Sequence, residues 1–150
     1  MSELKARLKS DLTTAMKARD KVRTGTLRMV LAAIATEETA GSAQRALDDD
    51  EVTKVLVRET KKRREAAEAF EKGGRTEDAA NERAESDIIA DYLPKQLTDE
   101  ELAGLVDAAV AETGASGMKE MGKVMKVLNP KVAGLAEGSR VAAEVKKRLA

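Results

Sequence analysis

The chain has 150 residues, with 27 basic and 27 acidic side chains and a formal net charge of zero. It contains no histidine, cysteine or tryptophan, which excludes an imidazole general base, a thiolate nucleophile, a disulfide and any metal site built on histidine or cysteine. A dedicated, tight nucleic-acid binder usually has a basic excess, so binding of that kind must here come from local basic patches.

The apolar residues form no long run. None approaches the roughly 20 residues of a membrane span. The first residues, Met1–Lys5, lack the apolar segment of a secretion signal. We therefore expect a cytoplasmic protein that does not enter a membrane.

Apolar residues recur at helical spacing along nearly the whole chain, and no strand pattern competes with them. A first helix is predicted from the stripe Leu4–Met16. Asp20 is the expected N-cap of a second helix, whose stripe runs from Leu27 to Ile34. A polar loop is expected from Gly41 to about Leu47.

A third helix is predicted to begin at Asp48–Glu51, where acidic groups complement the positive end of the helix dipole, and to end at Gly73-Gly74. Within it, glutamates flank Lys61–Arg64 at i,i+4 spacing. This pattern favours a solvated helix crossed by salt bridges over a basic patch. Thr76 is the expected cap of a fourth helix. Ala80, Ala84, Ile88 and Tyr92 follow one another at one-turn spacing in that helix.

Pro94 is expected to end the fourth helix, because proline disfavours helical geometry at the residue before it. The segment from Pro94 to Leu97 is the best domain boundary. We therefore predict an all-α fold with an N-terminal four-helix domain, residues 1–93, and a small three-helix tail domain, residues 94–150.

The first helix of the tail is predicted to begin with a capping box. In it, the side chain of Thr98 accepts a hydrogen bond from the backbone N–H of Glu101, and the side chain of Glu101 accepts one from the backbone N–H of Thr98. A short helix should follow from about Met118 to Leu128 and break at Asn129-Pro130. The last helix is expected from about Ser139 to the end.

The segment Gly117–Lys123 fits the opening of a phosphate-binding P-loop, G-x-x-x-x-G-K. The match fails at Val124, where a serine or threonine hydroxyl must reach magnesium, and no strand precedes it. We interpret Gly122 instead as a close packing contact between helices.

The same segment carries a lysine ridge. Lys119, Lys123 and Lys126 lie within about 60° of one another on a helical wheel. The other side holds Met118, Met121, Val124, Met125 and Leu128. The ridge is either a solvated face over a packed core or a phosphate-contacting surface. Basic residues that could join it on folding are Lys131, Arg140, Lys146, Lys147 and Arg148.

Two short motifs resemble a known family. Tyr92-Leu93-Pro94-Lys95-Gln96-Leu97, followed by Met121-Gly122-Lys123-Val124-Met125, resembles the YqeY-like family (the GatB/YqeY domain). Matching segments near the start extend the resemblance to essentially the whole chain. The motif residues expected to be structural are Tyr92, Leu93, Pro94, Gln96, Met121, Gly122, Val124 and Met125.

The chain departs from the family pattern at two positions. Glu137 precedes the glycine of the last helix where the family tends to have aspartate. Gly25 stands within the second helix, where glycine costs about 1 kcal/mol relative to alanine. We therefore expect local contacts that compensate at Gly25.

The resemblance implies an all-helical relative of the tail of GatB, a component of the tRNA-dependent amidotransferase, where that tail helps to hold the tRNA. Similar tails serve some glutaminyl-tRNA synthetases as tRNA-binding modules. The carbon–nitrogen ligase activity associated with the family, with glutamine as amido-N-donor, belongs on this interpretation to the larger enzyme. Such chemistry needs an activated nucleophile, and no serine of this chain has a histidine partner.

We therefore predict an accessory, non-catalytic module that binds tRNA or other structured RNA weakly and in a salt-sensitive way. No catalytic residue, metal site or cofactor is expected. The predicted RNA-binding residues are Lys119, Lys123, Lys126, Lys131, Arg140, Lys146 and Lys147. The alternative is a protein-interaction module that docks on a tRNA synthetase or on a component of the amidotransferase.

Overall fold

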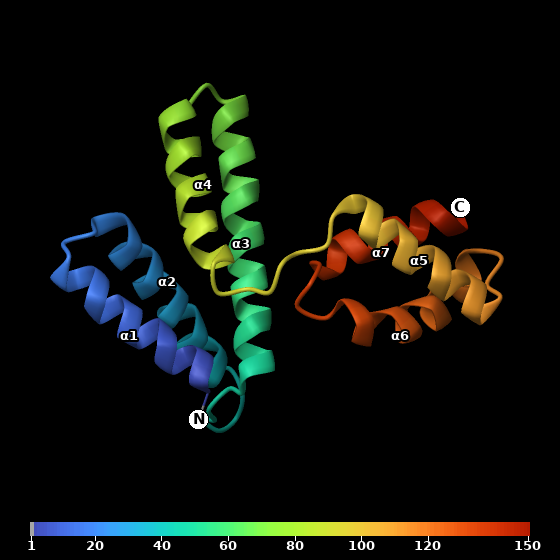
Figure 1. Cartoon of the computed structure of the whole chain (residues 1–150), viewed down its shortest axis with the longest axis horizontal. Coiled ribbons are helices and arrows are strands. Elements are labelled where there is room, and N and C mark those ends of the chain that lie inside the picture. The colour runs from blue at the N-terminus through green and yellow to red at the C-terminus, as the bar shows by residue number, and fades with distance from the viewer. Residues whose placement is uncertain (1) are drawn as a thin grey trace. The chain divides into compact units, whose positions relative to one another are not determined.

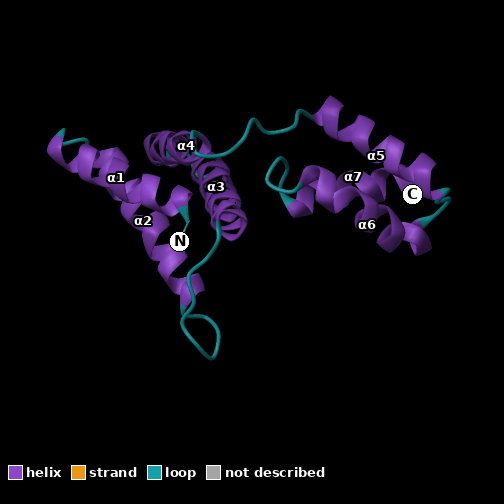
Figure 2. Cartoon of the chain, turned by 60° about the horizontal axis from the view of Figure 1, so that its bottom comes forward, coloured by secondary structure: helices purple, strands orange, loops and turns teal. Residues whose placement is uncertain are grey.

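The computed structural model describes residues 2–150, and the predicted all-helical class is confirmed over that range, which contains no strand (Figure 2). The elements are α1 (Glu3–Lys17), α2 (Lys21–Glu38), α3 (Asp49–Lys72), α4 (Thr76–Ala90), α5 (Asp99–Thr113), the 3₁₀ helix η1 (Met118–Glu120), α6 (Met121–Val132) and α7 (Gly138–Leu149). Contacts divide the chain into two compact units, residues 1–93 and 94–150.

The first unit consists of two helical hairpins, α1–α2 and α3–α4 (Figure 1). Its core gathers leucines, valines and isoleucines from all four helices and from the loop before α3. These buried residues are Leu8, Leu27, Val30, Ile34, Leu47, Val52, Val55, Leu56, Ile89 and Tyr92. All of these residues except Tyr92 are aliphatic.

Helix starts follow the local capping signals of the sequence. The Asp20 carboxylate accepts a hydrogen bond from Arg23 N at 3.1 Å and caps α2. Asp48 and Glu51 form a capping box at α3, and Thr98 and Glu101 form another at α5. These predicted caps are confirmed.

The expected cap of α4 is wrong, and the series Ala80, Ala84, Ile88 and Tyr92 does not form one buried face. Thr76 is the first helical residue, and Arg75 before it makes no side-chain capping bond. Ala80 and Ala84 are exposed, whereas Ala79, Ser86 and Ile89 are buried. The helix ends at Ala90, and Tyr92 beyond its end is buried in the core. The inward face depends on how α4 lies along α3. Alanine spacing alone cannot reveal it, because alanine is common on solvent faces as well.

In the second unit, the predicted break at Asn129-Pro130 is also wrong. The helix α6 continues through Pro130 to Val132. Val132 follows Val124 and Leu128 at one-turn intervals, and all of them are buried in the core shared with α5 and α7. Burial of Val132 thus favours the extra turn, although Pro130 has no N–H to donate to the carbonyl of the preceding turn.

The glycines also differ from expectation. A Cβ added at Gly122 or Gly25 would meet no atom within 4 Å apart from neighbouring residues and the backbone of its own helix. Gly122 is therefore not a close contact between helices, and no close packing compensates for glycine at Gly25. Within residues 2–150, no helix is both long enough and apolar enough to cross a bilayer.

Candidate functional site

The outer face of α6 carries the lysine ridge predicted from the sequence. Val124, Leu128 and Val132 turn toward the core of the second unit. Lys123 and Lys126 lie on the opposite side of the helix, and both are exposed. Lys119 is also exposed but belongs to η1, where the turn is tighter than an α-helical wheel assumes. Packing of α6 therefore leaves these ammonium groups facing solvent.

One lysine of the ridge, Lys123, and the nearby Lys131 are paired with acidic side chains. Lys123 Nζ lies 3.9 Å from Glu120 Oε2, and Lys131 Nζ lies 3.5 Å from Glu112 Oε2. Both lysines are exposed, and surface ion pairs of this kind contribute little to stability. By contrast, Lys119, Lys126, Lys146 and Lys147 form no ion pair with any residue that the structure describes.

Arg140 has a structural role that the sequence did not reveal. Its Nη2 donates to the carbonyl oxygen of Leu97 and to Asp99 Oδ1, both at 2.8 Å. Arg148 similarly donates to Asp107 of α5. These contacts hold α7 against α5 and the segment that precedes it, so the two arginines are less available to a ligand than the lysines are.

The first half of the Tyr92–Leu97 motif is fixed to the first unit. The hydroxyl of Tyr92 donates to Asp11 on α1, and the guanidinium of Arg7 lies 4.5 Å from the centre of the Tyr92 ring. Leu93 packs against the core of this unit. Tyr92 thus attaches the segment that follows α4 to α1.

The second half of the motif is fixed to the second unit. Gln96 Nε2 donates to the carbonyl oxygens of Pro94 and Gly134, at 2.8 and 2.9 Å. Leu97 N donates to the carbonyl oxygen of Leu135 at 2.8 Å. The motif is therefore the point where the chain passes from one helical unit to the other, with Tyr92 anchored in the first unit and Gln96 in the second.

The methionines on and before α6 are partly exposed to solvent. Val124 is buried, and Met121 and Met125 are partly buried against the core. Met118 in η1 is 46% exposed. This exposed thioether adjoins the exposed Lys119, so apolar and basic groups occur together at the start of the ridge.

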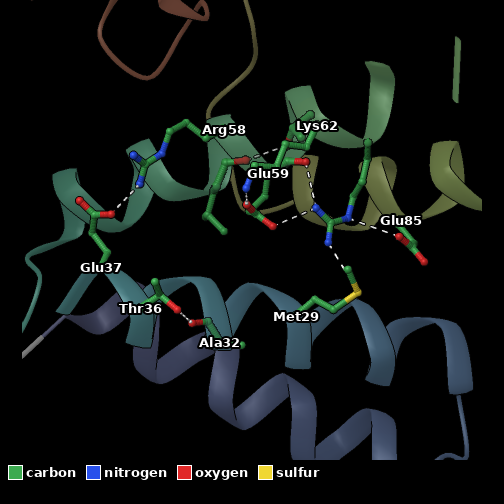
Figure 3. A network of polar contacts seen from close by, with 11 residues as sticks. Met29, Ala32, Thr36, Glu37, Arg58, Glu59, Lys62 and Glu85 are labelled. Carbon is green, nitrogen blue, oxygen red and sulfur yellow. Dashed lines mark hydrogen bonds and ion pairs between the residues drawn. The ribbon is translucent and has the colours of Figure 1, made fainter. Parts of the chain in front are cut away.

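The structure reveals a buried polar cluster in the first unit that sequence reasoning missed. Arg63 is only 3% exposed, although the pattern of Lys61–Arg64 predicts a solvated stretch. Arg63 Nη1 donates to the carbonyl oxygen and to Oε1 of Glu59, both at 3.0 Å, and Nε lies 3.3 Å from Glu85 Oε2. Figure 3 shows Glu59, Glu85 and Met29 approaching this point from α3, α4 and α2.

A periodic signal for this cluster was present in the sequence. Val52, Leu56, Arg63 and Ala67 share one face of α3, and all are buried. One position of this otherwise apolar face is therefore occupied by a charged residue, Arg63. Burial there also raises the pKa of the neighbouring Glu82, with a further contribution from the charge of Glu85.

The candidate site presents exposed ammonium groups on Lys119, Lys123 and Lys126. In residues 2–150 there is no group of acidic side chains positioned to hold a metal ion. Glu120 is paired with Lys123 of the ridge, and Glu112 is paired with Lys131. An ammonium surface of this kind suits phosphate oxygens.

Comparison with known proteins gives one family match and two curated relatives. The family model described as Yqey-like protein matches residues 5–149. "Altered inheritance of mitochondria protein 41, mitochondrial" of Clavispora lusitaniae is 31% identical over 129 residues, which cover 84% of this chain and 74% of the relative. The protein of the same name from Eremothecium gossypii is 33% identical over 109 residues, which cover 71% of this chain and 59% of the relative.

Proposed function

This chain belongs to the YqeY-like family, and we propose that it is an accessory module that binds structured RNA, tRNA above all, through phosphate contacts. In this proposal the unit of residues 1–93 is an N-terminal helical domain, and residues 94–150 are the tail domain that carries the RNA-binding surface. The proposal assigns no carbon–nitrogen ligase chemistry to the chain, since it contains neither cysteine nor histidine.

The observation that carries this proposal is the exposure of the α6 lysines on the side opposite the core. Lys123 and Lys126 can approach phosphates without disturbing any buried contact. Lys119, Lys146 and Lys147, all exposed, would extend the surface. Arg140 and Lys131 would contribute less, because both have acidic partners.

The mode of recognition follows from the side chains that are present. The chain has one phenylalanine, one tyrosine and no tryptophan, and Tyr92 is buried. Stacking of bases on aromatic rings is therefore unsuited to this molecule, and recognition would be by shape and backbone. With zero net charge, the affinity would be weak and would fall steeply with salt.

The double variant Lys123→Glu with Lys126→Glu tests this surface in a gel shift with total tRNA at low salt. We expect the shift to disappear, because both ammonium groups become repulsive carboxylates. The matched control is Lys54→Glu with Lys72→Glu, which makes the same charge change at exposed positions of α3. Retained binding by the α6 variant, or equal loss by both, would reject the proposed surface.

A second candidate function is docking on a tRNA synthetase or on a component of the amidotransferase. The observation that favours it is the exposure of Met118, because flexible thioethers adapt to apolar partner surfaces. A pull-down after nuclease treatment separates the candidates. Recovery of such an enzyme without RNA would support docking, and loss of all partners on nuclease treatment would support RNA binding.

The place of action in the cell is a further part of the proposal. We expect the chain to work in the cytoplasm, whereas the names of its relatives refer to mitochondria. Fractionation of cells that express the tagged chain, with tRNA binding measured in each fraction, tests this expectation.

A further inference from the structure

Two methionine sulfurs in the first unit accept hydrogen bonds from arginines. Arg63 Nη2 donates to Met29 Sδ at 3.7 Å, and Arg28 Nη2 donates to Met16 Sδ at 3.6 Å. The two methionines are nearly equally accessible, with exposures of 50% for Met29 and 47% for Met16. The arginines differ, because Arg63 is buried and Arg28 is exposed.

The buried guanidinium is poorly satisfied on the side that faces Met29. Both hydrogen bonds of Nη1 go to Glu59. Nε lies at ion-pair distance from Glu85 but makes no hydrogen bond. A thioether is a weak acceptor, so Nη2 also lacks a strong partner there. A buried donor without a good acceptor carries a free-energy cost that a stronger acceptor would remove.

We propose that Met29 is a reversible oxidation site whose sulfoxide oxygen is bound by the buried guanidinium of Arg63. The oxidant is a peroxide. The sulfur lone pair attacks one peroxide oxygen, the O–O bond breaks, an S–O bond forms, and the second oxygen leaves as water. The sulfide loses two electrons and the peroxide gains them. In the reverse step a dithiol supplies two electrons and two protons, becomes a disulfide, and the oxygen leaves as water.

The expected consequence is opposite to the usual effect of methionine oxidation. A sulfoxide in a packed core is destabilising, because a polar group replaces an apolar one. Met29 is half exposed, so its new oxygen stays partly hydrated while it accepts from Arg63. Since Met29 lies on α2 and Arg63 on α3, oxidation strengthens the attachment between these helices.

The test uses two proteins that each keep one internal methionine. One retains Met29 and the other retains Met16. Every other internal methionine is replaced by leucine, an exchange that packed cores usually tolerate. Both proteins are treated with hydrogen peroxide, and peptide mass analysis confirms the oxidised residue. Thermal unfolding is followed by the fluorescence of Tyr92, the one tyrosine in a chain without tryptophan, which reports on the first unit.

We expect oxidation to raise the unfolding temperature of the Met29 protein by about 2–4 °C. A methionine sulfoxide reductase should reverse the shift. The Met16 protein should show no shift, because water already satisfies the exposed Arg28. An unchanged or lowered unfolding temperature of the Met29 protein, or equal shifts in both proteins, overturns the proposal.

A second measurement avoids multiple substitutions. Met29→Gln supplies a permanent amide oxygen at the position of the sulfoxide, and Met29→Leu supplies none. We expect the glutamine variant to unfold at a higher temperature than the leucine variant, and the same pair at Met16 to unfold at equal temperatures. A leucine variant at Met29 that is as stable as the glutamine variant, or more so, also overturns the proposal.

Discussion

The hydroxyl of Tyr92 donates a hydrogen bond to Asp11 Oδ2 at 2.5 Å, which joins the segment after α4 to α1 across most of the first unit's sequence. Arg7 covers the tyrosine ring from the same helix. Burial, followed by the hydrogen bond to Asp11, raises the pKa of Tyr92 to about 12. The first residue of the family motif is thus an anchor between helices.

Tyr92 should give the first unit a measurable sensitivity to alkali. Its pKa is about 12 in the fold and about 10 in an unfolded chain. The fold favours the protonated hydroxyl, so this contribution to stability is complete below pH ~10 and is lost as the pH rises toward ~12. Tyrosinate absorbance reads this residue alone, as the chain has one tyrosine. A folded-state titration near pH ~10 would contradict the prediction. Tyr92→Phe, the control, should lack this pH dependence.

Glu38 should make the first unit sensitive to acid. Its carboxylate accepts from Lys5 Nζ at 2.8 and 3.0 Å and from Leu47 N at 3.4 Å. The hydrogen bond from Lys5 is the main cause that lowers the pKa of Glu38 below its ordinary value of 4.5. A lowered folded pKa means that the contribution to stability is present above the unfolded pKa and is lost as the pH falls through the folded one.

Urea unfolding of Glu38→Gln and wild type at neutral and acidic pH measures this contribution. The variant should be less stable near neutrality, and the difference should shrink as the pH falls, because wild-type Glu38 becomes protonated. Glu37→Gln is the neighbouring control, since Glu37 is exposed to solvent in its ion pair with Arg58. A difference between Glu38→Gln and wild type that stays constant with pH would refute this assignment.

Arg63 should be among the most sensitive positions of the first unit. Arg63→Ala leaves Glu59 and Glu85 without their buried cation, which should lower the free energy of unfolding by about 3–5 kcal/mol. Arg64→Ala, at the exposed neighbour, should change it by no more than about 0.5 kcal/mol.

Removal of the whole ion pair should be far less harmful than removal of one partner. In Arg63→Met with Glu59→Leu, apolar groups replace both charges of the pair between these two residues, and such exchanges are often neutral. Glu85 loses its partner as well, but its side chain is 25% exposed and stays in contact with water. Urea unfolding of the single and double variants measures the difference. Additive losses from the two positions would show that the buried pair is not coupled.

Two glycines should respond to alanine in opposite directions. Gly25 lies within α2 with open space around the missing Cβ, so Gly25→Ala should stabilise the chain by about 0.5–1 kcal/mol. Gly114 caps α5 with a φ of 68°, where a side chain is strained, so Gly114→Ala should destabilise it. Urea midpoints of the two variants check this, and a loss of stability at Gly25 would reveal a contact absent from the fold described.

The candidate surface could be predicted only in part. The exposure of Lys123 and Lys126 follows from their positions opposite Val124 and Leu128 on α6, because helical periodicity is a local property. The partners of Arg140 and Lys131 could not be predicted. Asp99 and Glu112 belong to another helix, α5, and only packing brings helices together.

The sequence by itself determined the helical class and where most helices begin. The capping groups of Asp20, Asp48 and Thr98 bond to backbone only three residues away, so no tertiary contact is needed to specify them. Only the tertiary structure decided that α4 buries Ala79 instead of Ala80, that Arg63 lies inside, and that α6 continues past Pro130. The physical reason is that a helix has a buried face only when a neighbouring helix packs against it.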